Sequence, residues 1–146
     1  MGCDHITSLN IFLIFSTSAA IMKPTSPTPF DEASLAPIVN TFYRYNLADK
    51  RINQFFAKIN MRALLIMQTK FLTHALSGAG INKKIMSMHH RHLGLQDHHF
   101  DAVISNLEKA LVDHNVGETE IRGILAAAEG TRESMLGRHT YKTDLE

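Results

Sequence analysis

A chain of 146 residues, 45% of them hydrophobic, is long enough for one domain with a real core and too short for two ordinary domains. Its 15 basic and 14 acidic residues leave a formal net charge of +1 and are scattered along the chain, which excludes the basic surface typical of nucleic-acid binding. Cys3 is the only cysteine, so an intrachain disulfide and a cysteine-based metal site are both excluded.

The chain begins with an extension, residues 1–31, that ends in a proline-rich linker. Its apolar run Leu9–Met22 falls short of the ~20 residues that a membrane-spanning helix needs, so we expect no stable membrane span. The run resembles a signal-peptide core, but no Lys or Arg precedes it, and Ile6 stands where the myristoylation pattern has Ser or Thr. We therefore expect a cytoplasmic protein, with an N-terminal leader that directs export or membrane attachment as the alternative.

Residues 32–137 are expected to form one all-α domain, followed by a tail over 138–146. Apolar residues recur at helical spacing, and no run alternates as a strand would. The predicted longer helices are about Ala36–Ala48, opened by Pro37, about Asn60–Leu76, about His98–His114, capped by Asp97, and about Glu118–Leu136. The residues expected to face inward from the first and third helices are Ile38, Val39, Phe42, Tyr43, Leu47, Phe100, Val103, Ile104, Leu107 and Leu111.

A short histidine-rich segment, residues 85–95, precedes the third long helix. Five of the nine histidines lie within residues 89–99. Read as a helix that its glycine ends, the segment places Met86, His90 and Leu93 on one face at i, i+4 and i+7. His90 is therefore the imidazole expected to point into the core, as either a hydrogen-bonded core residue or the ligand of an iron.

Two further polar side chains occupy apolar helix faces. Tyr43 lies on that of the first helix, and Gln68 interrupts the apolar stripe of the second. A buried hydroxyl or amide needs a hydrogen-bond partner, which is either an ordinary structural contact or a ligand. Together with an inward His90, these side chains indicate a small bundle that holds a cofactor in its middle.

Residues spread over several helices resemble one known family. In chain order they are Phe42-Tyr43, Leu47-Ala48-Asp49, Phe55-Phe56, Leu64, Gln68, Met86, His90, Gly94-Leu95 and Phe100. With these spacings the chain resembles the group I truncated haemoglobins from roughly Pro37 to Leu136. The resemblance implies an all-α truncated globin fold, a two-over-two helical sandwich around haem b.

The resemblance also implies a role for individual side chains. His90 is the expected axial ligand of the haem iron, and Tyr43 and Gln68 are the expected distal hydrogen-bonding residues, which face it. Phe56 would pack against the haem, and Leu64 would take the place of the distal histidine of ordinary globins. The remaining residues expected to line the haem edge are Leu65, Met86, Leu95, Phe100, Val103 and Leu107.

The function implied by this resemblance is reversible binding of dioxygen and other diatomic ligands, including nitric oxide and carbon monoxide. The resemblance also implies nitric oxide dioxygenation, which leaves ferric haem. Nothing in the chain resembles a flavin or nicotinamide site, so this activity would require a separate reductase. The alternative within the haem interpretation is oxygen storage, delivery or sensing without turnover.

Two alternatives belong to other classes of protein. The histidines of residues 89–99 would serve as a zinc or copper site in a helical interaction module. Against this, adjacent His98 and His99 are not expected to share a helix face, and no His-Glu-x-x-His pattern is present. A helical bundle without a cofactor is the other alternative, and it leaves the inward His90, Tyr43 and Gln68 unexplained.

Overall fold

The computed structural model describes residues 30–138, and all regular structure in that range is helical, which confirms the predicted all-α class. The elements are α2 (Glu32–Ala48), η1 (Asn53–Phe56), α3 (Met61–His74), η2 (Ala75–Ala79), α4 (Lys83–His90), η3 (Arg91–Leu93), α5 (Asp97–Asp113), α6 (Glu118–Glu129) and α7 (Arg132–Met135). No helix in this range has the length and apolar character needed to cross a bilayer. The expectations for the leader and for the tail after Arg138 lie outside the described residues.

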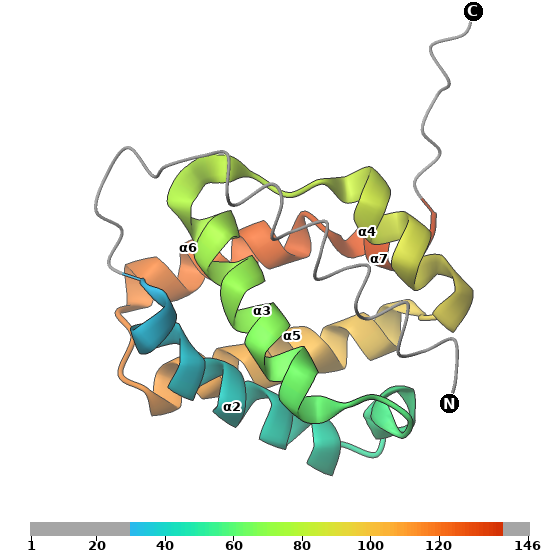
Figure 1. Cartoon of the computed structure of the whole chain (residues 1–146), viewed down its shortest axis with the longest axis horizontal. Helices are drawn as coiled ribbons and strands as arrows, with labels where there is room; N and C mark the ends of the chain where they lie inside the picture. The colour runs from blue at the N-terminus through green and yellow to red at the C-terminus, as the bar shows by residue number, and fades with distance from the viewer. Residues whose placement is uncertain (1–29, 139–146) are drawn as a thin grey trace, which may run out of the picture.

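The helices pack as pairs around a core. Helix α2 packs along both α3 and α5, α5 packs against α6, and α4 lies beside α7. Figure 1 shows α3 crossing the middle of the molecule in front of α5, with α4 and α7 together at the end away from α2. Helix α4, which bears His90, thus packs against α7, whereas α2, which bears Tyr43, packs against α3 and α5.

The first helix begins earlier than predicted because a capping box precedes Pro37. Asp31 is the N-cap, and its carboxylate accepts a hydrogen bond from the Ser34 backbone N–H at 2.8 Å. In return the Ser34 hydroxyl accepts one from the Asp31 N–H at 3.0 Å. These reciprocal bonds satisfy the free donors of a first turn at Glu32, so Pro37 lies inside the helix and does not open it.

Two other helix boundaries differ from the prediction. Gln96, and not Asp97, is the N-cap of α5, since the Gln96 backbone N–H donates to His99 Nδ1 at 3.0 Å. The predicted last helix is two helices, because Thr131 Oγ1 donates to the Ala128 carbonyl at 2.6 Å and the chain turns there. A side chain that bonds a nearby carbonyl competes with the helical ladder, which explains the break.

The core contains most of the expected apolar residues but differs at the end of α2. Leu47 is 41% exposed, so its predicted inward position is wrong, and its neighbour Asn46 is fully buried. Asn106 of α5 donates through Nδ2 to Asn46 Oδ1 at 3.0 Å and to Asp49 Oδ2 at 3.1 Å. Hydrogen bonds from the Arg51 guanidinium hold the pKa of the Asp49 carboxyl well below its usual range. This polar network fixes the end of α2 against α5.

Candidate functional site

The histidine segment is helical up to His90, as the sequence predicts, and its last turn is tighter. Leu93, which was expected to share the inward face of Met86 and His90, is 36% exposed, so that part of the prediction is wrong. Helix α4 starts after Asn82, whose side chain accepts from the Ile85 N–H at 3.1 Å, and has His90 as its final residue. The chain continues as the short helix η3 and ends at Gly94, which adopts φ +66°, a left-handed conformation that glycine allows without strain. The Asn82 cap and the Gly94 turn therefore define the two ends of the segment that carries His90.

The His90 ring is oriented by the helix that carries it. Its Nδ1 lies 2.7 Å from the Met86 carbonyl oxygen, one turn earlier. A carbonyl only accepts, so Nδ1 carries the proton and the neutral ring keeps its lone pair on Nε2. Burial lowers the pKa of His90 more than the bond to Met86 raises it, and nearby His89 and His92 lower it further. His90 is half-buried, whereas His92 is exposed.

Tyr43 lies in the core within a group of aromatic rings. It is 8% exposed, its ring centroid is 4.8 Å from that of Phe42, and it meets Phe56 edge-on at 5.7 Å. Burial raises the pKa of the Tyr43 phenol, so the hydroxyl stays protonated at neutral pH. No other side chain or carbonyl of residues 30–138 is hydrogen-bonded to that hydroxyl. Tyr43 thus combines a buried ring with a protonated hydroxyl that can donate to a ligand.

Helix α3 carries the second candidate polar residue. Gln68 is half-buried and lies one turn after Leu64, which is 8% exposed, so the two share one helix face. In the described part of the chain, the Gln68 amide has no hydrogen-bond partner. The Gln68 amide is therefore a hydrogen-bond donor that is available to solvent or to a ligand.

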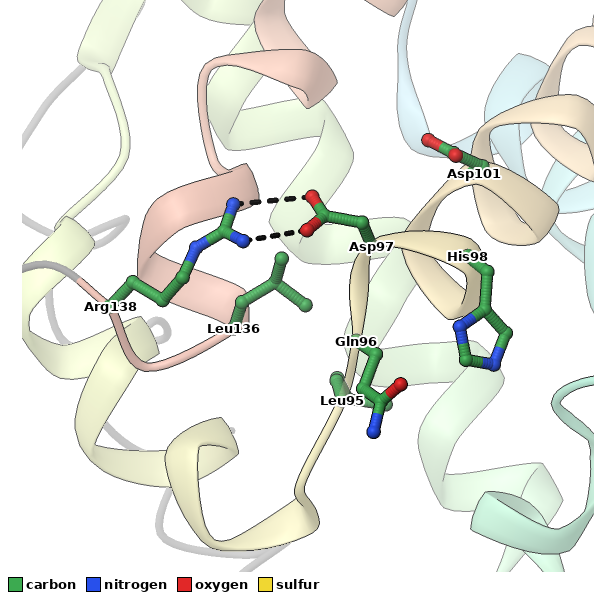
Figure 2. A pocket seen from close by; sticks show the side chains of 7 residues that line it. All are labelled: Leu95, Gln96, Asp97, His98, Asp101, Leu136 and Arg138. Atoms are coloured by element: carbon green, nitrogen blue, oxygen red, sulfur yellow. Dashed lines mark hydrogen bonds and ion pairs between the residues drawn. The ribbon is translucent and has the colours of Figure 1, made fainter.

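The structure brings together part of the predicted lining. One buried cluster contains Tyr43, Leu64 and Leu107, with Phe56, Leu65 and Val103 packed against it. Met86 and Phe100 are buried outside this cluster, at 7% and 5% exposed. Leu95 is half-buried and lines a shallow pocket of about 600 Å³ beside Arg138 (Figure 2). The position of His90 opposite Tyr43 and Gln68 stays a prediction.

The other histidines do not assemble a conventional metal site. Among residues 30–138, no three His, Cys, Asp or Glu side chains are arranged to hold a metal ion. His98 and His99 are closer than their adjacency led us to expect, with ring centroids 3.9 Å apart, and His99 also meets the Phe55 ring at 5.0 Å. These two histidines lie in the first turn of α5, and no third metal-binding side chain joins them. The zinc or copper interpretation therefore has no geometric support in this range.

One group of side chains beside this region has no signal in the sequence. Arg132 and Arg138, near the end of the domain, form ion pairs with Asp97 at the start of α5. The two partners of each pair are far apart in sequence, and no helical spacing relates them, so no pattern in a single sequence could have revealed the pairs.

Comparisons with known proteins agree with this architecture. The sequence profile of the family described as bacterial-like globin matches residues 31–136. A group 1 truncated haemoglobin from Tetrahymena pyriformis is 37% identical over 108 residues, which cover 73% of this chain and 89% of that protein. Another from Tetrahymena thermophila is 35% identical over 117 residues, covering 77% of this chain and 97% of the relative.

Solved structures give the same result. The 2/2 haemoglobin from Synechococcus sp. PCC 7002, in a form with covalently attached haem, superposes with a TM-score of 0.67 at 31% identity, covering 73% of this chain and 93% of that one. The Tetrahymena pyriformis protein in its Fe(III) form has a TM-score of 0.64 at 36% identity, with coverages of 73% and 92%. The fold is thus that of a globin with two-over-two helical packing. The chain belongs to the bacterial-like globins and, within them, to the group I truncated haemoglobins.

Proposed function

We propose that this protein holds one haem b through His90 and uses it to bind dioxygen and other diatomic gases. The observation that carries the proposal is the 2.7 Å hydrogen bond from His90 Nδ1 to the Met86 carbonyl. It fixes the ring and leaves Nε2 as the nitrogen with a free lone pair, the form of imidazole that ligates globin haem. Membership of the truncated haemoglobins supports the same assignment.

The donor set fits a haem iron better than a bare metal ion. Among residues 30–138, no three metal-binding side chains come together, at His90 or elsewhere. A zinc site needs several protein ligands. Haem needs few, because the porphyrin nitrogens supply the equatorial ligands. The buried side chains of Leu64, Met86 and Phe100 provide the apolar surroundings that a porphyrin requires.

Tyr43 and Gln68 would hold the gas ligand from the opposite side. Dioxygen gains partial negative charge on binding, and the protonated Tyr43 hydroxyl and the Gln68 amide are hydrogen-bond donors. The hydroxyl needs little reorganisation, because Phe42 and Phe56 hold the Tyr43 ring in the core. Each bond adds about 1 kcal/mol to ligand retention, so the pair would slow release by an order of magnitude or more.

We further propose nitric oxide dioxygenation as the reaction of this site. Bound ferrous haem supplies the chemistry, in which dioxygen and nitric oxide combine as nitrate and the iron is left ferric. An external reductase must then return one electron, since the sequence contains no flavin or nicotinamide motif. Tyr43 and Gln68 contribute by retaining dioxygen until nitric oxide arrives.

Stopped-flow mixing tests this reaction. Reduced, haem-loaded protein equilibrated with dioxygen is mixed with nitric oxide, and we expect one nitrate and one ferric haem per protein within the mixing time or shortly after it. Carbon monoxide-saturated protein is the control and should not be oxidised. Oxygen binding with slow or absent oxidation by nitric oxide would remove the enzymatic claim and favour oxygen storage, delivery or sensing.

A further inference from the structure

Arg132, outside the proposed haem site, occupies an unusual environment at the start of α7. Its guanidinium donates to Asp97 Oδ1 at 3.0 Å, to Asp101 Oδ1 at 2.5 Å and to Glu129 Oε1 at 2.7 Å. The Cζ atom also lies 4.6 Å from the centroid of the Phe100 ring. The Arg132 side chain is only 19% exposed. Isolated surface ion pairs contribute little, but a planar guanidinium that bonds three carboxylates and covers a ring has a fixed geometry.

A second arginine closes the same contact from the end of the domain. Arg138 donates to both carboxylate oxygens of Asp97, at 2.6 and 3.2 Å (Figure 2). It also pairs with Glu133. The guanidinium groups hold the pKa of the Asp97 carboxyl below its usual range, Arg138 contributing most. Between the two arginines, Gly137 passes so close to Arg91 that an added Cβ would lie 2.7 Å from the Arg91 Cβ.

These contacts lie at both ends of the connection that follows His90, the proposed haem ligand. Arg91 directly follows His90, and α7 packs against α4. Asp97 and Phe100 belong to the first turn of α5, which follows the short connection after Gly94. The segment 132–138 therefore ties the end of the His90 helix to the start of the next helix. We call these ion pairs, of Arg132 and Arg138 with their carboxylates, the C-terminal clamp.

We propose that Arg132 is a positioning residue for the haem, acting through Phe100 and through the placement of the His90 helix. The inference rests on the proposed ligation by His90. The clamp holds the first turn of α5 against the 132–138 segment, and α7 of that segment packs on α4, so the clamp would set the position of His90 toward a bound haem. Removing the guanidinium frees the Phe100 ring and lets the connection 91–96 move. The expected consequences are faster haem loss and a changed iron–histidine bond, without loss of the fold.

The test compares Arg132→Met with Arg132→Lys in the haem-loaded full chain. Methionine keeps much of the length and apolar contact of arginine but removes the charge, whereas lysine keeps a charge that cannot bond three carboxylates at once. Transfer of haem to excess apomyoglobin should be about two- to tenfold faster in Arg132→Met and intermediate in Arg132→Lys. This is at or below the roughly tenfold effect of replacing a direct partner of a metal ligand, because Arg132 acts on His90 only through Phe100 and α4. Arg122→Met is the matched control, because Arg122 is 72% exposed and its nearest carboxylate contact, with Glu118, is 3.9 Å long.

A spectroscopic readout separates positioning from stability. The iron–histidine stretching band in the resonance Raman spectrum of the reduced protein should shift or broaden in Arg132→Met and stay unchanged in Arg122→Met. A lowered melting temperature with an unchanged band and haem-loss rate would overturn the proposal. If Arg132→Met does not fold, Asp101→Asn removes one partner of the clamp, and a wild-type band and haem-loss rate in that variant would overturn it equally. Failure of the wild-type protein to take up haem would instead contradict the proposed function.

Discussion

Replacing His90 with alanine is expected to lower haem affinity by about 100-fold or more, because it removes the axial bond itself, and changes behind a metal ligand alone cost 10- to 100-fold. The neighbouring variants His89→Ala and His92→Ala should keep tight binding. His92 is exposed, and the bond from His90 Nδ1 to the Met86 carbonyl orients the His90 ring alone. The measurement is a titration of each purified apoprotein with hemin, followed by its absorbance.

The matched set of histidines makes this test decisive. All three variants remove an imidazole from the same short segment, so a general effect on α4 or η3 would lower haem affinity in each of them. Added imidazole should partly restore the spectrum of His90→Gly, since a free imidazole fits the space that the side chain leaves. Loss of haem in His89→Ala or His92→Ala with retention in His90→Ala would overturn the ligand assignment.

Changing Tyr43 to phenylalanine is expected to leave haem bound and to speed dioxygen release about five- to tenfold, the equivalent of one lost hydrogen bond of 1 to 1.4 kcal/mol. The ring contacts of Tyr43 with Phe42 and Phe56 do not involve the hydroxyl, so the core should keep its packing. The measurement is the dioxygen dissociation rate after mixing with excess carbon monoxide.

The glutamine variant provides the comparison. Gln68→Leu should also speed release, and the double variant should release dioxygen faster than either single one. Because Gln68 is half-buried and Tyr43 is buried, we expect the tyrosine change to have the larger effect. An unchanged rate in Tyr43→Phe, with haem fully bound, would count against the distal role of Tyr43.

Helical periodicity predicted most of the fold because the apolar faces of the helices carry most of the information. Its failures occurred where polar side chains decide the local structure. The capping box of Asp31 and Ser34 starts the first helix before Pro37, which the proline signal alone would not allow. At the end of that helix, spacing favoured Leu47, whereas hydrogen bonding from Asn106 buries Asn46. Asn46 follows Phe42 by four residues, so helical spacing alone also places Asn46 on the inward face.

Part of the candidate site could be predicted from the sequence. The spacing of Met86 and His90 predicted that they share a helix face. The structure adds that the Met86 carbonyl orients the His90 ring. The haem itself and the distal roles came from the resemblance to a family, because no spacing specifies a porphyrin. The C-terminal clamp was not predictable, since Arg132 of α7 and Asp97 of α5 are 35 residues apart and meet only in the folded chain.

Ligation of a haem iron by His90, with small gases bound on the other side, is the proposal on which the expected ligand chemistry depends. The most direct measurement is the absorption spectrum of the reduced, hemin-reconstituted protein before and after addition of carbon monoxide. We expect one haem per chain and a Soret band that sharpens and shifts with carbon monoxide, and that is absent or altered in His90→Ala. A wild-type protein without Soret absorbance after reconstitution, or one that instead binds stoichiometric zinc, would contradict it.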